Sequence, residues 1–361
     1  MKIEITDKHL DAMRLLGDPL ADAVIAALPD KVWDNKDILP IIDERGRSDK
    51  SGPFYEFYNH IMTVPDWVNP EKMQIAAQVG IQYAPLSGLI LTTASLVESY
   101  SAAKGAKVLM RTGRLKKDVI NRLFETAKFA HDIGISKFPG PGTSAHATII
   151  RVRLLHAMVR KFTLKTEKPS PWKDEWGTPI NQEDYAMTLL MFSHVYTRSI
   201  HKLGVRLTPH EIESIQHVWR YTGYLLGVDE SLLCESAADE EKLYSIIARR
   251  QFHPDEDSVA LSHGVLDALN NYPPFYIPSP ILYQISRFLI GDRLADAMQF
   301  PPAWPSIWIT PLLAVIAVIT RTQDLLPWGK STALAFGKWF TGNTLDNAFK
   351  AKPASFTFRS M

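Results

Sequence analysis

The sequence predicts an all-α fold, and three observations support this prediction. Long segments with helical start and stop signals recur along the whole chain. Alternating apolar and polar runs of the kind that form strands are scarce, and turn-bounded hairpin pairs are absent. Prolines and glycines fall in short corners between the helical segments rather than in flexible linkers. We therefore expect one helical domain over residues 1–361.

The clearest helix signal is a capping box at Thr208. Glu211 follows three residues later, proline occupies the first helical position, and the helix is expected to end at Gly227. Three further long amphipathic helices are expected at 115–134, 143–162 and 181–204.

The composition excludes several classes of protein. Of the 361 residues 46% are hydrophobic, so the chain can bury a large core. With 40 basic and 39 acidic residues the net charge is +1, which lacks the basic excess of a nucleic-acid-binding protein. The single cysteine, Cys234, excludes an internal disulfide and a multi-thiolate metal site. The first residues lack the features of an export signal, so we expect a cytoplasmic protein.

Residues 297–320 form a run of 24 uncharged positions, long enough to span a bilayer. Prolines interrupt its first part, and only 312–320 is cleanly helical and apolar, so we expect a buried helix there. The alternative is a peripheral membrane contact through 304–339. Indole rings favour membrane interfaces, and this stretch contains Trp304, Trp308, Trp328 and Trp339.

One helical face in the segment 151–160 carries a histidine between two arginines. Arg153, His156 and Arg160 stand at i, i+3 and i+7, within an arc of about 60°. The rest of the segment is apolar, and buried arginines need anionic partners. A haem would supply two carboxylates and an iron that accepts neutral imidazole. The alternative is that the arginines pair with Asp or Glu and that His156 is a core histidine.

A second candidate face lies in 121–126. Arg122 and Thr126 are i, i+4 neighbours and Glu125 adjoins them, so a cation, a hydroxyl and a carboxylate could line one pocket wall. The alternative is a solvated helix face. His217, on the helix that begins at Thr208, is a further candidate ligand, although single helical histidines are more often core residues. Motifs for a serine hydrolase, a zinc protease, a nucleotide-binding loop and covalent haem attachment are absent.

Four segments together resemble the latex-clearing-protein (rubber oxygenase) and mpaB-type oxygenase family. In chain order they are RLFET (122–126), VRLLHAMVR (152–160), GTPINQED (177–184) and HVWRYTGYLLGV (217–228). The resemblance covers roughly 75–270. It implies a globin-like helical core that binds haem b non-covalently, with helical extensions at 1–74 and 271–361.

The resemblance also implies roles for single residues. His156 would be the proximal iron ligand, and Arg153 and Arg160 would flank it toward the haem propionates. Arg122 and Thr126 match the distal polar pair of the family. His217 matches a further haem-proximal histidine, to which we assign no role.

Two departures from the family pattern affect the expected substrate. The latex-clearing members have a lysine where this chain has Glu125, so a closed, lysine-ligated iron is not expected here. Their catalytic glutamate would fall within 103–112, which contains no acid, and Glu98 and Glu125 are the nearest candidates. We therefore do not expect the protein to attack extracellular polyisoprene.

The sequence thus predicts a haem-b-dependent oxygenase, cytoplasmic or peripheral to a membrane. It would activate dioxygen for oxygenation or alkene cleavage of an apolar small molecule, with Arg122, Glu125 and Thr126 at the catalytic side. Two alternatives stay open: a non-enzymatic haem- or lipid-binding helical protein, and a structural membrane-associated protein without a cofactor.

Overall fold

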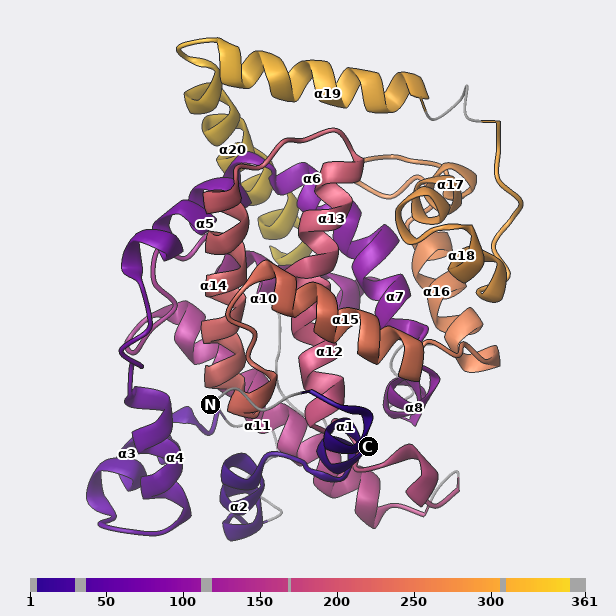
Figure 1. Cartoon of the computed structure of the whole chain (residues 1–361). Coiled ribbons are helices and arrows are strands. Elements are labelled where there is room, and N and C mark those ends of the chain that lie inside the picture. Colours follow the sequence, from indigo (N-terminus) through magenta and orange to yellow (C-terminus); the bar gives the residue numbers. More distant parts are fainter. Residues whose placement is uncertain (1–4, 30–36, 112–118, 168–169, 306–309, 351–361) are drawn as a thin grey trace.

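The chain folds into α-helices joined by short loops (Figure 1). The computed structural model describes residues 5–29, 37–111, 119–167, 170–305 and 310–350. Among these residues β-structure is limited to an isolated antiparallel bridge between Ala102 and Phe252. The all-α prediction is confirmed.

The helices differ widely in length, and the longest described ones are α11 and α20. In chain order the α-helices are α1 (Asp7–Leu15), α2 (Pro19–Ala27), α3 (Leu39–Ser48), α4 (Pro53–Met62), α5 (Pro70–Gln82), α6 (Ala84–Ile90), α7 (Leu96–Tyr100), α8 (Ala103–Arg111), α10 (Val119–Gly134), α11 (Ser144–Lys165), α12 (Gln182–Phe192), α13 (His194–Lys202), α14 (Pro209–Leu226), α15 (Ala237–Gln251), α16 (Glu256–Ala268), α17 (Ser279–Ile290), α18 (Asp292–Ala297), α19 (Thr310–Leu325) and α20 (Gly329–Lys350). A π-helix, η2 (Leu91–Ser95), joins α6 to α7, and 3-10 helices occur at η3 (Asp174–Trp176) and η4 (Glu230–Leu232).

Local capping explains where the predicted helices begin and end. The capping box at Thr208 is present at the start of α14, and Gly227 ends that helix with a left-handed φ of 79°. Thr143 caps α11 by accepting a hydrogen bond from the His146 backbone N–H at 3.1 Å. The segment predicted at 181–204 is instead two helices, α12 and α13, which meet at Ser193. The Ser193 hydroxyl donates to the Leu189 carbonyl at 3.1 Å, an interaction that often accompanies a bend in a helix.

Two hydrophobic clusters form the interior, and α11 belongs to both. The larger cluster includes Ile149 of α11 together with residues of α5, α7, α12, α14 and α17. The smaller one packs Ile150 and Leu154 of α11 against α2, α3 and α4. The N-terminal helices therefore cover one face of α11, while the other face points into the main core.

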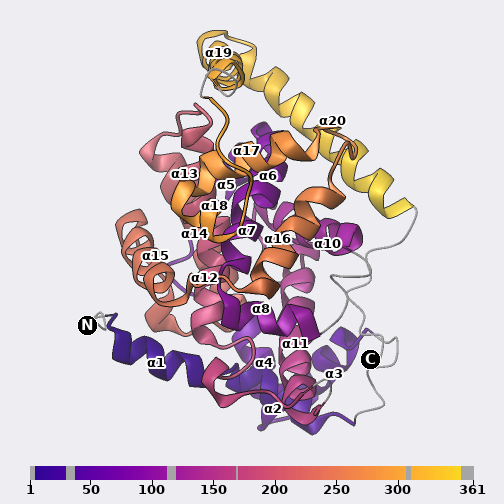
Figure 2. The same ribbon diagram turned by 90° about the vertical axis from the view of Figure 1, so that its right-hand side faces the viewer.

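The C-terminal helices lie against and across one end of this core. Figure 2 shows α20 running along the core from α19, and α20 packs on α5 and α6. Gly337 makes this approach possible, because a Cβ there would lie only 1.8 Å from the Ile81 carbonyl oxygen.

The expectation that 312–320 forms a buried helix is wrong. These residues lie in α19, but Val315, Val318 and Ile319 are 55%, 60% and 52% exposed. The apolar composition of this short segment predicts burial, yet α19 crosses the end of the molecule and leaves one face uncovered (Figure 1). Trp308 lies outside the described residues. In the described part of the chain no single helix is long and apolar enough to span a membrane. The bent helix pair 70–82 and 84–100 is long and apolar enough only when the two are taken together.

Candidate active site

A cavity of about 330 Å³ brings together four of the side chains that the sequence singled out. Arg122, Glu125 and Thr126 of α10 line it together with His156 of α11. The remaining lining is mainly apolar and comes largely from these two helices and from η2, α7, α8 and α12, with a few side chains from α14 and α16. Ligand sites in proteins are typically mostly apolar cavities of this order of size with a few convergent polar groups. We call it the first cavity.

His156 presents a neutral imidazole to this cavity. Burial lowers its pKa to about 4, and the nearby positive charges of Arg160 and Arg122 act in the same direction. Its Nδ1 atom is buried without a hydrogen-bond partner among the described residues. Buried polar atoms normally have partners, so this one fits a bound ligand. Neutral imidazole is also the form that binds a metal.

Tyr185 of α12 adds a second unpaired polar group beside His156. The two ring centroids are 5.4 Å apart, and Tyr185 also lines the first cavity. Its hydroxyl is buried and donates to no described residue. Burial strongly raises the pKa of this phenol, although the Arg160 guanidinium lies close enough to oppose this, so the group stays a neutral hydrogen-bond donor.

Arg153 is held by a carboxylate of the N-terminal region. Its Nε and Nη2 donate to Asp18 at 2.7 and 2.9 Å, and its Nη1 donates to the Leu225 carbonyl at 3.0 Å. Both side chains are 1% exposed, so this is a fully buried bidentate ion pair. Gly227 closes over it, since a Cβ there would lie 2.5 Å from Arg153 Nη2.

Arg160, about two helical turns further along α11, is held by a partly exposed carboxylate and two backbone carbonyls. Its Nη1 donates to Asp22, and its Nε and Nη2 donate to the carbonyls of Pro179 and Ile180 at 3.0 and 2.8 Å. Both arginines thus have protein carboxylates as partners, which is the alternative that the sequence left open. They join α11 to α2 on either side of His156.

Thr126 is partly engaged within its own helix. Its hydroxyl donates to the Arg122 carbonyl at 3.0 Å, which leaves the hydroxyl oxygen as an acceptor toward the cavity. The Arg122 charge lowers the pKa values of both His156 and Tyr100, although burial still raises that of Tyr100 to about 12. The Arg122 guanidinium therefore lies close to the His156 imidazole.

Two acids among the described residues line the first cavity, Glu125 and Asp184. Asp184 accepts hydrogen bonds from Arg14 Nη1 at 3.2 Å and from the Asn181 side-chain amide at 2.9 Å. Burial raises the pKa of Asp184 although Arg14 opposes this. Glu98 is placed elsewhere: it is fully buried, paired with Arg198, and accepts from the Tyr244 hydroxyl at 2.6 Å.

The structure does not bring His217 to this cavity. Its Nε2 accepts a hydrogen bond from the Asn69 backbone N–H at 2.8 Å, at the start of α5. The ring packs edge-on against Trp67 with centroids 5.7 Å apart. In this position His217 links α14 to α5, as a satisfied core histidine does.

The sequence did not point to Tyr185, Asp184, Asp18 or Asp22 as parts of the site. Tyr185 stands directly after the GTPINQED segment, which was a detectable signal. Asp18 lies 135 residues before Arg153, and no local pattern could pair the two.

Comparison with known proteins gives one consistent result. The family described as "ER-bound oxygenase mpaB/B'/Rubber oxygenase, catalytic domain" matches residues 79–321. A rubber oxygenase of Streptomyces sp. (strain K30) is 25% identical over 345 residues, which cover 86% of this chain and 80% of that protein. The structure of latex clearing protein in its closed state has the same fold, with a TM-score of 0.70, 19% identity and 90% of each chain covered.

Proposed function

Since the chain belongs to the ER-bound oxygenase mpaB/B'/rubber oxygenase catalytic family, we propose that it is a haem-b oxygenase acting on an apolar substrate. The reaction would be oxygenation or cleavage at an alkene. His156 would be the axial ligand, and Arg122, Glu125 and Thr126 would face the reacting groups.

The observation that carries this proposal is the state of His156. A neutral imidazole with an unpaired ring nitrogen faces a cavity that also contains the family's Arg-Leu-x-x-Thr side chains. An isolated core histidine would normally be hydrogen-bonded, as His146 is on the same helix, where its Nε2 lies 2.8 Å from the Ile61 carbonyl oxygen. When bound, haem b supplies the dioxygen chemistry, and the protein supplies the binding and orientation.

The remaining polar residues have roles that follow from their contacts. Tyr185 has a free donor for a ligand held beside His156. Arg153 and Arg160 are already paired with Asp18 and Asp22, so we assign them to holding His156 in place rather than to the haem propionates. If a propionate replaced Asp18 as the partner of Arg153, the buried Asp18 carboxylate would be left unpaired, which is costly.

Glu125 is our candidate for a proton acceptor. It lines the first cavity at the position where the latex-clearing members have lysine. A carboxylate at this place can take a proton from a substrate that reaches the cavity.

A test of the proposal combines a spectrum with an activity. The purified protein should show a Soret band with about one haem per chain, and it should consume oxygen when long-chain alkenes are added. Haem binding without oxygen consumption would favour a carrier or sensor. A colourless protein that fails to take up added haem would contradict the proposal.

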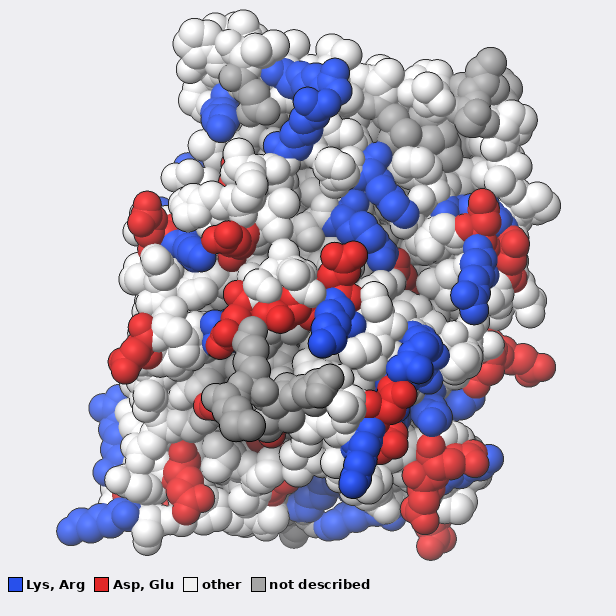
Figure 3. Space-filling model, viewed as in Figure 1, with Lys and Arg blue, Asp and Glu red and all other residues white. Residues whose placement is uncertain are grey.

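We also propose that α19 and α20 contact a membrane surface. The large exposed apolar side chains of these two helices and of the turn between them are Val315, Val318, Ile319, Leu325, Leu326, Trp328, Phe336 and Trp339. The exposed cations Arg321, Lys330 and Lys338 belong to the same two helices. Figure 3 shows basic but no acidic described side chains at this end of the visible face. Apolar and aromatic side chains beside cations favour an anionic bilayer.

Vesicle sedimentation can test this contact. The double variant Trp328→Ser and Trp339→Ser should bind phosphatidylglycerol vesicles at least tenfold more weakly than the unchanged protein. Leu15→Ser is the matched control, because Leu15 is 71% exposed at the end of α1, far from α19. Equal binding of all three proteins would exclude the proposed surface.

A further inference from the structure

A second cavity, of about 200 Å³, adjoins the first. The residues that line both cavities form a partition between them: Leu91, Ser95, Leu123, Met191, Phe192 and Trp219. The π-helix η2 supplies Leu91 and Ser95, and the Ser95 hydroxyl donates to the Met191 carbonyl at 2.8 Å across the partition. π-helical turns often occur at functional sites.

The second cavity has an uncharged lining. None of the described residues that line it is Asp, Glu, Lys or Arg, whereas the first cavity contains Arg122, Glu125 and Asp184. A carboxylate or phosphate in the second cavity would lose its hydration without gaining a cation. Such a loss is expensive for an isolated charge in an apolar site.

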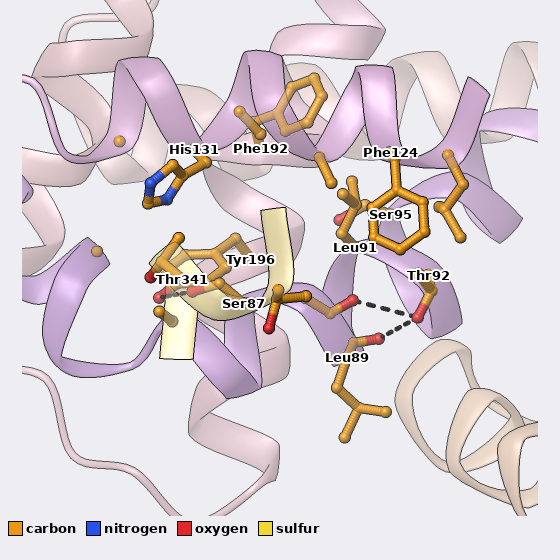
Figure 4. A pocket seen from close by; sticks show the side chains of 18 of the residues that line it. Ser87, Leu89, Leu91, Thr92, Ser95, Phe124, His131, Phe192, Tyr196 and Thr341 are labelled. Carbon is orange, nitrogen blue, oxygen red and sulfur yellow. Dashed lines mark hydrogen bonds between the residues drawn. The ribbon is translucent and has the colours of Figure 1, made fainter. Parts of the chain in front are cut away.

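Polar side chains lie at both ends of the second cavity, but Thr92 and Ser95 at the partition end already donate to the carbonyls of Leu89 and Met191. Figure 4 shows His131, Tyr196, Ser87 and Thr341 together, while Phe124 and Leu91 lie toward the other end. The hydroxyl oxygens of Ser87 and Tyr196 are 3.1 Å apart, and the Ser87 hydroxyl is 3.0 Å from the Tyr83 carbonyl oxygen.

His131 is the polar side chain best suited to a ligand at this end. Burial lowers its pKa to about 4, and the charges of Asp132 and Lys128 on the same helix act in opposite directions. The ring is thus neutral near pH 7 and has one N–H donor and one acceptor nitrogen. No hydrogen bond joins it to another described residue.

The second cavity also meets the surface through α20. Phe275 lines the cavity and is 38% exposed, and its ring packs against Phe340 of α20 with centroids 5.6 Å apart. On α20, Phe336 and Trp339 face outward while Phe340 and Thr341 line the cavity. Only α20 therefore separates a hydrocarbon molecule at its exposed face from the cavity.

We propose that the second cavity binds an amphiphile whose hydrocarbon chain ends in a neutral hydrogen-bonding group, such as an alcohol or a carbonyl. The neutral group lies at His131, Tyr196 and Ser87, and the hydrocarbon chain points toward the partition. That the bound amphiphile is a substrate rests on the proposed oxygenase function. The substrate would then react at carbons remote from its polar end, because that end is held away from the first cavity.

The first test compares two probes of equal length, 1-octanol and octanoate, titrated calorimetrically into the purified protein at pH 7.5. We expect 1-octanol to bind at least tenfold more tightly, because only octanoate brings a charge into the uncharged cavity. Equal affinities, or tighter binding of octanoate, would overturn the proposal.

Two variants locate the binding. Ala127→Leu adds bulk to the second cavity without touching the first, and it should weaken octanol binding at least tenfold; Ala26→Leu, exposed on α2, is its control. His131→Leu should weaken octanol binding about fivefold, as expected for one lost hydrogen bond. It should leave the affinity for octanoate unchanged. His253→Leu, at an exposed histidine, is its control. Wild-type octanol affinity in both cavity variants would place the ligand elsewhere.

These titrations need neither haem nor turnover, so the two proposals can fail separately. A protein that binds octanol selectively but takes up no haem would contradict the oxygenase and retain the second site. A haem-loaded protein that does not distinguish the two probes would contradict the second site alone.

Discussion

The two cavities share a wall but differ in the charge of the rest of their lining. The first contains Arg122, Glu125 and Asp184 around a neutral histidine, His156. The second contains a neutral histidine, His131, but none of its described lining residues is Asp, Glu, Lys or Arg. The difference indicates that the two cavities have different roles. Charged groups stand where a cofactor and reacting atoms would be held, and uncharged groups stand where an apolar molecule would be selected.

The largest effect should come from the ion pair that supports the first cavity. Arg153→Met leaves Asp18 buried without its partner, which should cost about 3–5 kcal/mol of folding free energy. The matched control is Arg151→Met on the same helix, whose pair with Asp37 is partly exposed and should contribute about 1 kcal/mol or less. Urea unfolding measures both. Similar losses in the two variants would mean that Arg153 does not anchor α11 as described.

The next effect concerns Glu125, a charged residue of the first cavity, and its role in turnover. Glu125→Gln keeps the shape of the side chain and removes a base from the first cavity, so turnover should fall about 100-fold with unchanged haem content. Oxygen consumption with an alkene substrate measures it. Asp184→Asn is the comparison. If that variant loses turnover while Glu125→Gln keeps it, Asp184 is the proton acceptor instead.

A smaller effect concerns the neutral histidine of the second cavity. The pKa of His131 is lowered to about 4, below its value of 6.5 in the unfolded chain. As the pH falls through 6.5 toward 4, the unfolded chain binds a proton that the folded protein does not, so stability is lost over this window. At pH 5 this one histidine costs about 2 kcal/mol relative to pH 8. His131→Gln should therefore show a smaller acid-induced fall in unfolding free energy, and an identical fall would mean that His131 is solvated.

The smallest effect comes from the unpaired phenol of the first cavity. Tyr185→Phe removes a buried hydroxyl that donates to no described residue, so the ligand-free protein should be as stable as before or slightly more so. Haem affinity should fall about fivefold, as for one lost hydrogen bond. Tyr244→Phe is the contrasting control, because its hydroxyl donates to Glu98 and its removal should destabilise the fold. A destabilised Tyr185→Phe protein would show that this hydroxyl has a structural partner.

Features set by neighbouring residues could be predicted from the sequence. Thr143, Asn181 and Thr208 begin helices because the side chain of each accepts a hydrogen bond from the backbone N–H three residues ahead. Helical periodicity likewise placed Arg122, Glu125 and Thr126 on adjoining positions of one helix, and all three line the first cavity. Their meeting with His156 came from the family resemblance, since periodicity says nothing about which helices pack together.

Features that depend on distant parts of the chain could not be predicted. The partner of Arg153 is 135 residues away, and an apolar stretch such as 312–320 has the same composition whether it is buried or lies on the surface. His217 shows the same limit. Its place on α14 was predictable, but its bond to the backbone of Asn69 depends on how α14 packs against α5.

The haem content of His156→Ala tests the central claim most directly. The matched control is His146→Ala on the same helix, where the lost imidazole lies 2.8 Å from the backbone carbonyl oxygen of Ile61 and does not line the first cavity. Both proteins would be purified in parallel, checked for helical content by circular dichroism, and scanned across the Soret region. We predict that His156→Ala keeps its helices but loses the Soret band and most of its haem, while His146→Ala keeps both. A wild-type Soret band and full haem load in His156→Ala would contradict the assignment of His156 as the axial ligand.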